Sequence, residues 1–488
     1  MTSSRPLALP LAAALGLACA GPREAARAAA QPGAPDAAFR GAKPPPSPVE
    51  PRFAAPVPAE SRLPNGARLL VVENHAVPLV SIEVVVPAGV VAEPPGKAGL
   101  AGFTASMLTE GTEKLPALAF SEAVEDLAAR LSASAGPEST RVRLNCLAET
   151  LPRALDLLAA ALVEPAFRPE DVERVRGLLL AGLLQKKASP PALAADEAAR
   201  ILFGPRHPLG QPSGGTPETV QAIGREDLAR FHSEWYRPGG AIVSVSGDTT
   251  LADMERLLGA KLAAWKSRPP PALSLPPRPA IDRRTVTLVD KPGASQSQVW
   301  LVGPLFPASH PDRVPLGIAN NVLGGLFGSR LNMNLREEKG YSYGVRSSLQ
   351  LGRDYGYFQA AGGVQARFTA EALAEFEKEL AAFSTGALRE GELSKSKEAA
   401  IRSLPAALET NDAVAGSIAQ AAFVGLPLDW YRRLPGLVAA VDDAAVARVA
   451  KAWLDPARMP VVVVGPRAGN EERIRALGLG PVEEPPRR

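Results

Sequence analysis

The sequence has few of the residues that build disulfides and metal sites. It contains 2 cysteines, Cys19 and Cys146, and 4 histidines, His75, His207, His232 and His310. Once Cys19 is removed or acylated, no intramolecular disulfide can form, so stability must come from an apolar core. Cys146 lies in an alternating, strand-like segment and is expected to be a buried, small apolar residue. No two histidines lie within five residues of each other, which excludes a compact histidine-based metal motif.

Strong charge of one sign and long apolar runs are also missing. The net charge is +3, and no Lys/Arg cluster with interleaved aromatics occurs, so nothing favours a nucleic-acid partner. The apolar run at residues 6–18 is too short to span a bilayer comfortably. With 488 residues, 46% hydrophobic and 22% charged, the chain has room for two to four globular domains with full cores.

The first nineteen residues have the layout of a secretion signal, with Arg5, the apolar run and small residues near the end. Residues 16–19 (GLAC) resemble a lipobox, in which Cys19 is lipidated and becomes the mature N-terminus. The pattern departs from the usual one at Gly16, where Leu is common, so simple cleavage stays open beside lipidation. The expected location is the periplasm, after secretion across the inner membrane, with a lipid anchor. Residues 20–60, rich in Ala, Pro and Gly, are predicted to form a disordered tether.

The remaining chain is predicted to hold two domains. The first spans residues 61–266, a proline-rich linker spans 267–283, the second domain spans 284–470, and 471–488 are a tail. Apolar patterns in the first domain predict strands at 67–73, 79–86, 140–147 and 241–246, and helices at 96–108, 121–131, 151–163, 169–187 and 217–236.

The second domain repeats the pattern of the first. Residues 217–223 (PETVQAI) match residues 435–441 (PGLVAAV) at an offset of 218, and Gly247 and Gly465 close similar strands at the same offset. Residues 167–177 and 388–398 agree at an offset of 221. The alternative is a chance alignment of short apolar strings. Two copies of one unit predict an α+β fold of two homologous domains, each a mostly antiparallel sheet packed with helices.

Residues 324–345 (GGLFGSRLNMNLREEKGYSYGV) are a candidate site. They predict a glycine-rich turn, a short helix at 330–338 with Ser329 as N-cap, and a turn into a strand. Arg336 then lies near the helix end and Tyr343 just beyond it. A cation and a phenol held together can bind a polarised carbonyl or an anion. The alternative is a surface arginine and a half-buried strand tyrosine.

Residues 99–112 (GLAGFTASMLTEGT) resemble the zinc-binding helix of the pitrilysin/insulinase family of metallopeptidases, which includes the mitochondrial processing peptidases. That family typically has G-L-A-H-F-L-E-H-M-L-F-x-G-T here, containing an inverted HxxEH motif. The similarity continues in FGPRHPLG at 203–210 and in the S-R-L-x(4)-R-E-x-x-G-Y-S-Y run of the second half. It implies a metallohydrolase-like tandem repeat.

The residues for the family's zinc chemistry are missing. The motif needs two imidazoles one helical turn apart with a glutamate between them as general base, and these positions hold Gly102, Ala105 and Ser106. The third ligand, a glutamate about 76 residues further on, corresponds to Gly182. Glu110 has no imidazole partner nearby and is expected to be a solvated charge at the helix end. A zinc site built from the scattered histidines is the least favoured alternative.

Arg336 and Tyr343, in contrast, match the family's second-half pair. The resemblance implies that they bind the substrate carbonyl and support the tetrahedral intermediate. In split members of the family, one chain carries the zinc and another carries the pair. The chain is therefore expected to be a zinc-less subunit without a cofactor of its own, binding peptide or unfolded protein beside a zinc-bearing homologue. The alternative is a non-enzymatic scaffold or peptide-binding protein of the same fold.

Overall fold

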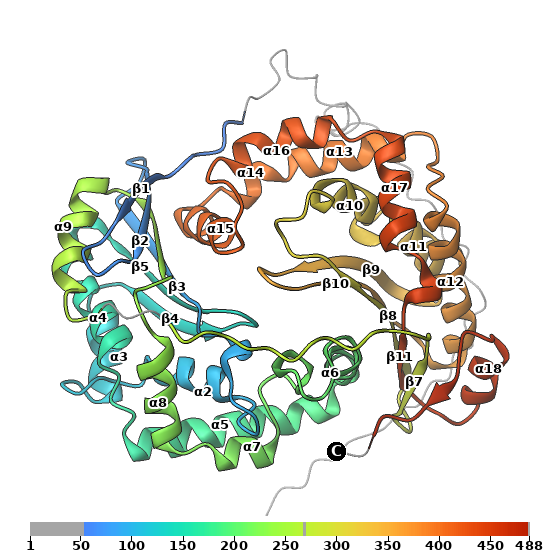
Figure 1. Cartoon of the computed structure of the whole chain (residues 1–488), viewed down its shortest axis with the longest axis horizontal. Coiled ribbons are helices and arrows are strands. Elements are labelled where there is room, and N and C mark those ends of the chain that lie inside the picture. Colours follow the sequence, from blue (N-terminus) through green and yellow to red (C-terminus); the bar gives the residue numbers. More distant parts are fainter. Residues whose placement is uncertain (1–52, 267–269, 487–488) are drawn as a thin grey trace, which may run out of the picture. The chain divides into compact units, whose positions relative to one another are not determined.

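Two six-stranded sheets, one in each half of the chain, form the framework of the protein (Figure 1). The computed structural model describes residues 53–266 and 270–486, and residues 54–488 form one unit. The predicted secretion signal, Cys19 and most of the predicted tether lie outside the described residues. In order across sheet 1 the strands are β1 (Ala59–Arg62), β2 (Arg68–Glu73), β6 (Ile242–Gly247), β3 (Leu79–Val86), β5 (Thr140–Leu147) and β4 (Arg130–Ala135).

Sheet 2 repeats this order. Its strands are β12 (Val482–Glu483), β7 (Val286–Asp290), β11 (Val461–Gly465), β8 (Gln296–Leu305), β10 (Gly356–Gln365) and β9 (Ser342–Leu351). The pairs β2–β6 and β7–β11 are parallel, and the next three pairs in each sheet are antiparallel. Gly247 ends β6 and Gly465 ends β11, so the predicted repeat and the α+β fold class are confirmed.

The two outer strands differ. β1 precedes β2 and pairs with it in an antiparallel manner, whereas β12 comes from the C-terminal end of the chain and lies parallel to β7. The segment predicted as a tail therefore adds α18 (Glu471–Ala476) and β12 to the second half, and Ile474 is fully buried. The described part of the predicted linker, residues 270–283, holds no helix or strand.

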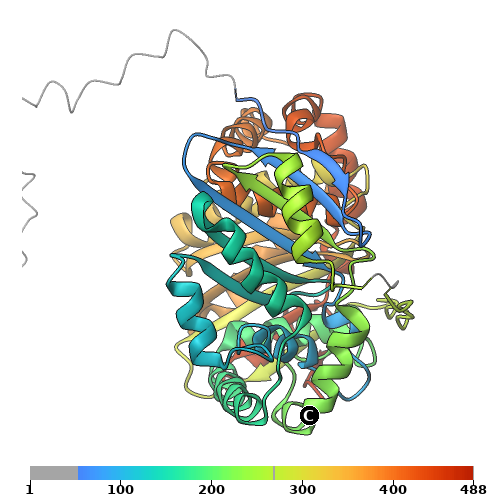
Figure 2. The ribbon, with the colours of Figure 1, turned by 90° about the vertical axis from the view of Figure 1, so that its left-hand side faces the viewer.

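Apart from α6 (Pro190–Phe203), the helices of the first half lie across one face of sheet 1 (Figure 2). Three predictions need correction. The helix predicted at 96–108 is the shorter α2 (Leu100–Met107), because the chain turns at Gly96 and Gly99, which have positive φ values, before the helix begins at Leu100. The predicted helix at 217–236 is two helices because the chain breaks at Ile223 and Gly224, and the helix predicted at 121–131 ends at Glu125 because Leu131 belongs to β4. The helices are α2 (Leu100–Met107), α3 (Ala117–Glu125), α4 (Leu151–Val163), α5 (Pro169–Ala188), α6 (Pro190–Phe203), α7 (Pro217–Ala222), α8 (Arg225–Trp235) and α9 (Leu251–Lys261).

The second half buries a matching core between sheet 2 and its own helices. The α-helices here are α10 (Arg313–Asn320), α11 (Arg330–Asn332), α12 (Thr369–Ser384), α13 (Glu392–Arg402), α14 (Leu404–Ala407), α15 (Asn411–Phe423), α16 (Trp430–Ala439), α17 (Asp443–Trp453) and α18. Two π-helical turns, Asn321–Gly325 and Met333–Glu338, flank α11.

Each half also contributes one helix to the other half's sheet. Helix α6 packs on β8 and β11 of sheet 2, and α15 packs on β3 and β6 of sheet 1 (Figure 1). Both begin after a hydroxyl N-cap, Ser189 and Thr410, whose side chain accepts a hydrogen bond from the amide three residues on. These caps are 221 residues apart, so α6 and α15 are equivalent elements of the repeat.

Within 53–266 and 270–486, no helix combines the length and the apolar character that crossing a bilayer requires.

Candidate functional site

The predicted turn, helix and strand around Arg336 are present. Helix α11 continues into the π-helical turn Met333–Glu338, the chain turns at Gly340 with a φ of 65°, and β9 begins at Ser342. Ser329 holds the N-cap position, but the predicted side-chain cap is absent, and its buried Oγ has no hydrogen-bond partner among the described residues. The turn places Arg336 and Tyr343 next to each other.

Arg336 lies between two aromatic rings. Its guanidinium carbon is 5.0 Å from the centre of the Tyr343 ring and 4.8 Å from the centre of the Phe327 ring. Its Nε is 3.1 Å from Oε1 of Glu337. The Tyr343 side chain is 85% exposed rather than half-buried, and Phe327 is 56% exposed. A cation and a phenol therefore share one solvent-accessible surface. Phe327 was not predicted as part of the site, although it lies in the glycine-rich turn, close to the start of the helix.

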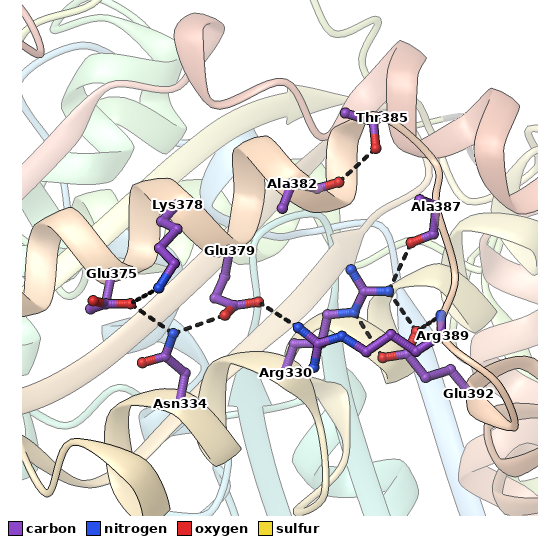
Figure 3. Close-up of polar contacts among 10 residues, drawn as sticks. All are labelled: Arg330, Asn334, Glu375, Lys378, Glu379, Ala382, Thr385, Ala387, Arg389 and Glu392. Carbon is purple, nitrogen blue, oxygen red and sulfur yellow. Dashed lines mark hydrogen bonds and ion pairs between the residues drawn. The ribbon is translucent and has the colours of Figure 1, made fainter.

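A buried polar network fixes the helix that carries Arg336 (Figure 3). Arg330 is buried and donates to both carboxylate oxygens of Glu392, at 2.8 and 2.5 Å, and to the carbonyl oxygen of Ala387 at 2.8 Å. One turn further on, Nδ2 of Asn334 donates to Glu375 and to Glu379, each at 2.8 Å. The helix is thus tied to α12 and to the start of α13, which restricts where Arg336 can point.

The positions that the resemblance assigns to the zinc ligands lie on two helices that pack against each other, α2 and α5. Gly102 and Gly182 carry no side chain, and a Cβ built at either would meet nothing within 4 Å. Ala105 is buried, and the Ser106 hydroxyl donates to the carbonyl oxygen of Gly102 at 3.0 Å. The site thus keeps open space where ligand side chains would stand, but its donors do not fit a zinc ion.

Neighbouring groups do not replace the missing ligands. Glu110 forms an ion pair with Arg174 of α5, so it is a paired charge rather than the solvated one that was expected. Across the described ranges, no group of three or more His, Cys, Asp or Glu side chains is arranged to hold a metal ion.

Each histidine already has a partner for one ring nitrogen. Asp248 lies 2.6 Å from His75 and raises its pKa, and burial lowers the pKa of His232 to about 4. The other contacts are Nε2 of His232 with the carbonyl oxygen of Leu162 at 2.9 Å, Nδ1 of His207 with the Leu209 amide at 3.0 Å, and Nδ1 of His310 with the Asp312 amide at 3.1 Å.

Glu93 stabilises the start of α2 and was not predicted. Its buried carboxylate accepts from the Gly99 amide at 3.1 Å and from the Ala101 amide at 2.9 Å, as an N-terminal capping group does. Burial raises the pKa of Glu93 to about 7, against the two backbone hydrogen bonds, which lower it. Helix α2 therefore has a specific anchor at its N-terminus.

Cys146 is buried in β5, as predicted. Burial raises the pKa of its thiol to about 11, so the thiolate is scarce near neutral pH.

The fold and the site define a tandem α+β chain in which Arg336 and Tyr343 lie side by side, and in which the described residues hold no cluster of metal-binding side chains. Residues 68–200 match the insulinase family (peptidase family M16), and residues 222–400 match the peptidase M16 inactive domain. The chain belongs to peptidase family M16, and these findings support an inactive member of it.

The relatives include proteins named as uncharacterized zinc proteases and a protein named as a non-peptidase homolog. The chain is 30% identical over 318 residues to an uncharacterized zinc protease of Mycobacterium bovis, covering 64% of this chain and 70% of that protein. It is 26% identical over 351 residues to the uncharacterized zinc protease YmxG of Bacillus subtilis (71% and 84%). It is 27% identical over 378 residues to the non-peptidase homolog YmxG of Helicobacter pylori (76% and 85%).

Solved structures share the fold. A peptidase M16 inactive domain from Pseudomonas fluorescens superimposes with a TM-score of 0.79 at 24% identity, covering 84% of this chain and 98% of that one. A protease from Helicobacter pylori gives a TM-score of 0.79 at 22% identity, covering 85% of this chain and all 100% of the other.

Proposed function

We propose that this chain is the zinc-less subunit of a heterodimeric metallopeptidase and supplies Arg336 and Tyr343 to an active site whose zinc is held by a homologous partner. The observation that carries the proposal is the pairing of these two side chains on an exposed surface, in a chain whose expected zinc-ligand positions hold no ligand side chain. Peptide or unfolded protein is the proposed substrate.

The division of labour follows from the chemistry of peptide hydrolysis. Donors for an oxyanion accelerate the reaction only when they lie about 3 Å from the reacting carbonyl oxygen. They do not generate the nucleophile, which in this class is a metal-activated water. Gly102, Ala105, Ser106 and Gly182 offer no ligand, so the nucleophile has to be formed on another chain. Arg336 and Tyr343 then bind the carbonyl oxygen and the negative charge that develops on it.

Reconstitution tests the proposal. The full chain is mixed with a zinc-bearing homologue from the same organism, and the mixture is analysed by gel filtration and with a quenched fluorescent peptide. The expected result is a one-to-one complex whose peptidase activity far exceeds that of either chain alone. The proposal is wrong if the two chains elute separately and the activity of the zinc-bearing chain is unchanged.

The alternative is a non-enzymatic scaffold or peptide-binding protein. It is favoured by the lack of a zinc-binding side chain at every expected ligand position and by the accessible aromatic surface of Phe327 and Tyr343. On this alternative the complex forms, but removal of the Arg336 side chain leaves its activity unaltered.

A periplasmic location with lipidated Cys19 is a separate proposal, based on residues 5–19. Expression of the full chain with and without Cys19→Ser, followed by membrane fractionation and mass spectrometry of the N-terminus, tests it. A diacylglyceryl group on Cys19 and loss of membrane association in the variant are expected. Mature protein cleaved elsewhere, or equal fractionation of both proteins, contradicts it.

A further inference from the structure

A cavity of about 300 Å³ lies between α6 and the face of sheet 2 that α6 covers. We call it the α6 pocket. Its wall is mostly apolar, and its volume is at the lower end for ligand sites, enough for a single bulky group. Its lining includes Ala199, Phe203, Trp300, Tyr355, Tyr357 and Gln359.

The repeat shows that the fold does not require this cavity. In the first half, the equivalent space is filled by buried Glu83, which forms ion pairs with Arg141 and Arg143, and Arg141 also donates to Gln420 of α15. Glu83 pairs with Ser244 of β6, and Trp300 pairs with Val462 of β11, 218 residues further on. Glu83 and Trp300 therefore hold equivalent positions.

The other members of the network correspond in the same way. By strand register, Gln359 stands where the first half has Arg141, and Ala361 stands where it has Arg143. By the helix offset of 221, Ala199 of α6 stands where α15 has Gln420. Shorter side chains on the helix and on β10 thus leave an opening where the first half has a closed ionic cluster.

Aromatic rings and uncharged polar groups line the opening. Phe203 meets Tyr355 and Tyr357 edge to face, with ring centres 5.9 and 6.2 Å apart. Nε1 of Trp300 is buried and has no hydrogen-bond partner in the described part of the chain, and the side-chain amide of half-buried Gln359 has no partner there either. A buried donor without a partner costs about 1–3 kcal/mol, so a ligand carrying an acceptor is favoured.

Charge does not favour an ionic ligand. Asp196, the acidic group in the wall, is buried and forms an ion pair with Lys186 at 2.6 Å, and it accepts from the Ser213 amide at 3.1 Å. Its charge is therefore compensated within the protein. The walls are aromatic, the side-chain amide of Gln359 is free, and the charge of Asp196 is compensated by Lys186. These features suit an apolar group next to a peptide bond.

We infer that the α6 pocket binds one bulky apolar side chain of a polypeptide, with the adjoining peptide group hydrogen-bonded to Gln359. The inference rests on the proposed function in that it takes peptide as the substrate, and it adds a preference for Phe, Leu or similar residues at a position away from Arg336 and Tyr343.

The experiment uses the purified chain alone and fluorine NMR. The probe is the acetylated, amidated peptide Gly-Gly-(4-fluorophenylalanine)-Gly-Gly, and the competitors carry Phe, Leu, Ala, Glu or Lys at the centre. Ala199→Phe fills the pocket with a large side chain. Ala199→Gln introduces the smaller side chain that Gln420 provides at the equivalent position of α15. Ala452→Phe is the matched control, because Ala452 lines a separate cavity of about 250 Å³ beside Trp453.

Binding to the wild type is expected, with Phe and Leu peptides competing at least about 10 times better than Ala, Glu or Lys peptides. Both Ala199 variants should weaken binding by about 10-fold or more, while Ala452→Phe binds as the wild type does. Equal competition by all peptides, or unchanged binding in folded Ala199→Gln, overturns the inference. Because no partner or zinc is present, this result is independent of whether reconstitution succeeds.

Discussion

The guanidinium of Arg336 lies over the Tyr343 ring, 5.0 Å from its centre, and Phe327 covers its other side at 4.8 Å. Three elements meet here: the glycine-rich turn, the π-helical turn and the start of β9. Cation–π contacts of exposed groups contribute about 0.5–1 kcal/mol each, so the rings restrict the arginine without burying it. The ring of Tyr343 therefore helps to position Arg336, and the Tyr343 hydroxyl is a second donor that can be removed separately.

Tyr343→Phe separates the phenol from the ring. It keeps the contact with Arg336 and removes one donor to the oxyanion, so kcat of the reconstituted complex should fall by about 10²–10³ while KM changes little. Steady-state peptide hydrolysis measures this. A fall in kcat of less than about threefold would show that the hydroxyl does not contact the reacting carbonyl.

Phe327→Ala removes one restraint on Arg336 and leaves both donors. The expected loss in kcat/KM is about 2–5-fold, which corresponds to one exposed cation–π contact. Phe327→Tyr should restore the activity, since it restores the ring. Loss of activity in both variants would instead indicate that the turn itself is disturbed.

Arg330 and Glu392 hold the helix in place, and breaking this pair should destabilise the second half. Glu392→Gln leaves the buried guanidinium without its counter-charge and should lower the free energy of unfolding by about 3 kcal/mol. The matched control is Arg402→Ala, because the ion pair of Arg402 with Glu398 is exposed and should contribute less than about 0.5 kcal/mol. Urea unfolding followed by tryptophan fluorescence measures both. Equal effects in the two variants would contradict a structural role for the buried pair.

Glu93 predicts a pH dependence of stability. Its pKa rises from the ordinary glutamate value of 4.5 to about 7 in the folded chain, so its contribution is fully present below pH 4.5 and is lost as the pH rises through 7. The loss amounts to about 3 kcal/mol at most. Thermal unfolding at pH 5 and pH 8 should show a larger decrease for the wild type than for Glu93→Gln. Parallel decreases for the two proteins would contradict this assignment.

The degenerate zinc site should be restorable. Wild-type chain, dialysed against zinc and then against buffer, should retain far less than one zinc ion in atomic absorption. The combined substitutions Gly102→His, Ala105→Glu, Ser106→His and Gly182→Glu should bind one zinc, because α2 and α5 still pack together and both glycines face open space. The variant with the two histidines alone is the control and should bind more weakly. Stoichiometric zinc in the wild type would overturn the account.

Periodicity and turn residues predicted much of the fold. Strands β3 and β5 and helix α4 have the expected bounds because their apolar spacing and flanking turns agree. The exchange of α6 and α15 between the halves was not predicted, since a helix with one apolar face does not specify which sheet it will cover. For the same reason the α6 pocket was not foreseen: it depends on Ala199 and Gln359 meeting across two halves of the chain.

The candidate site was predictable only in part. Sequence spacing and the family resemblance identified Arg336 and Tyr343, whose adjacency follows from one tight turn. The capping carboxylate of Glu93 was missed because it precedes its helix by several residues, outside the usual N-cap position. The predicted Ser329 cap was wrong, because its buried hydroxyl accepts no hydrogen bond from the helix amides.

Arg336→Ala in the reconstituted complex, with Arg402→Ala as control, tests whether this chain supplies a donor to the oxyanion. The account predicts that the complex still forms and that kcat falls by about 10²–10³, because a charged donor to the oxyanion is lost while the partner's zinc is untouched. An Arg336→Ala complex with the activity of the control would contradict the account and identify the chain as a scaffold.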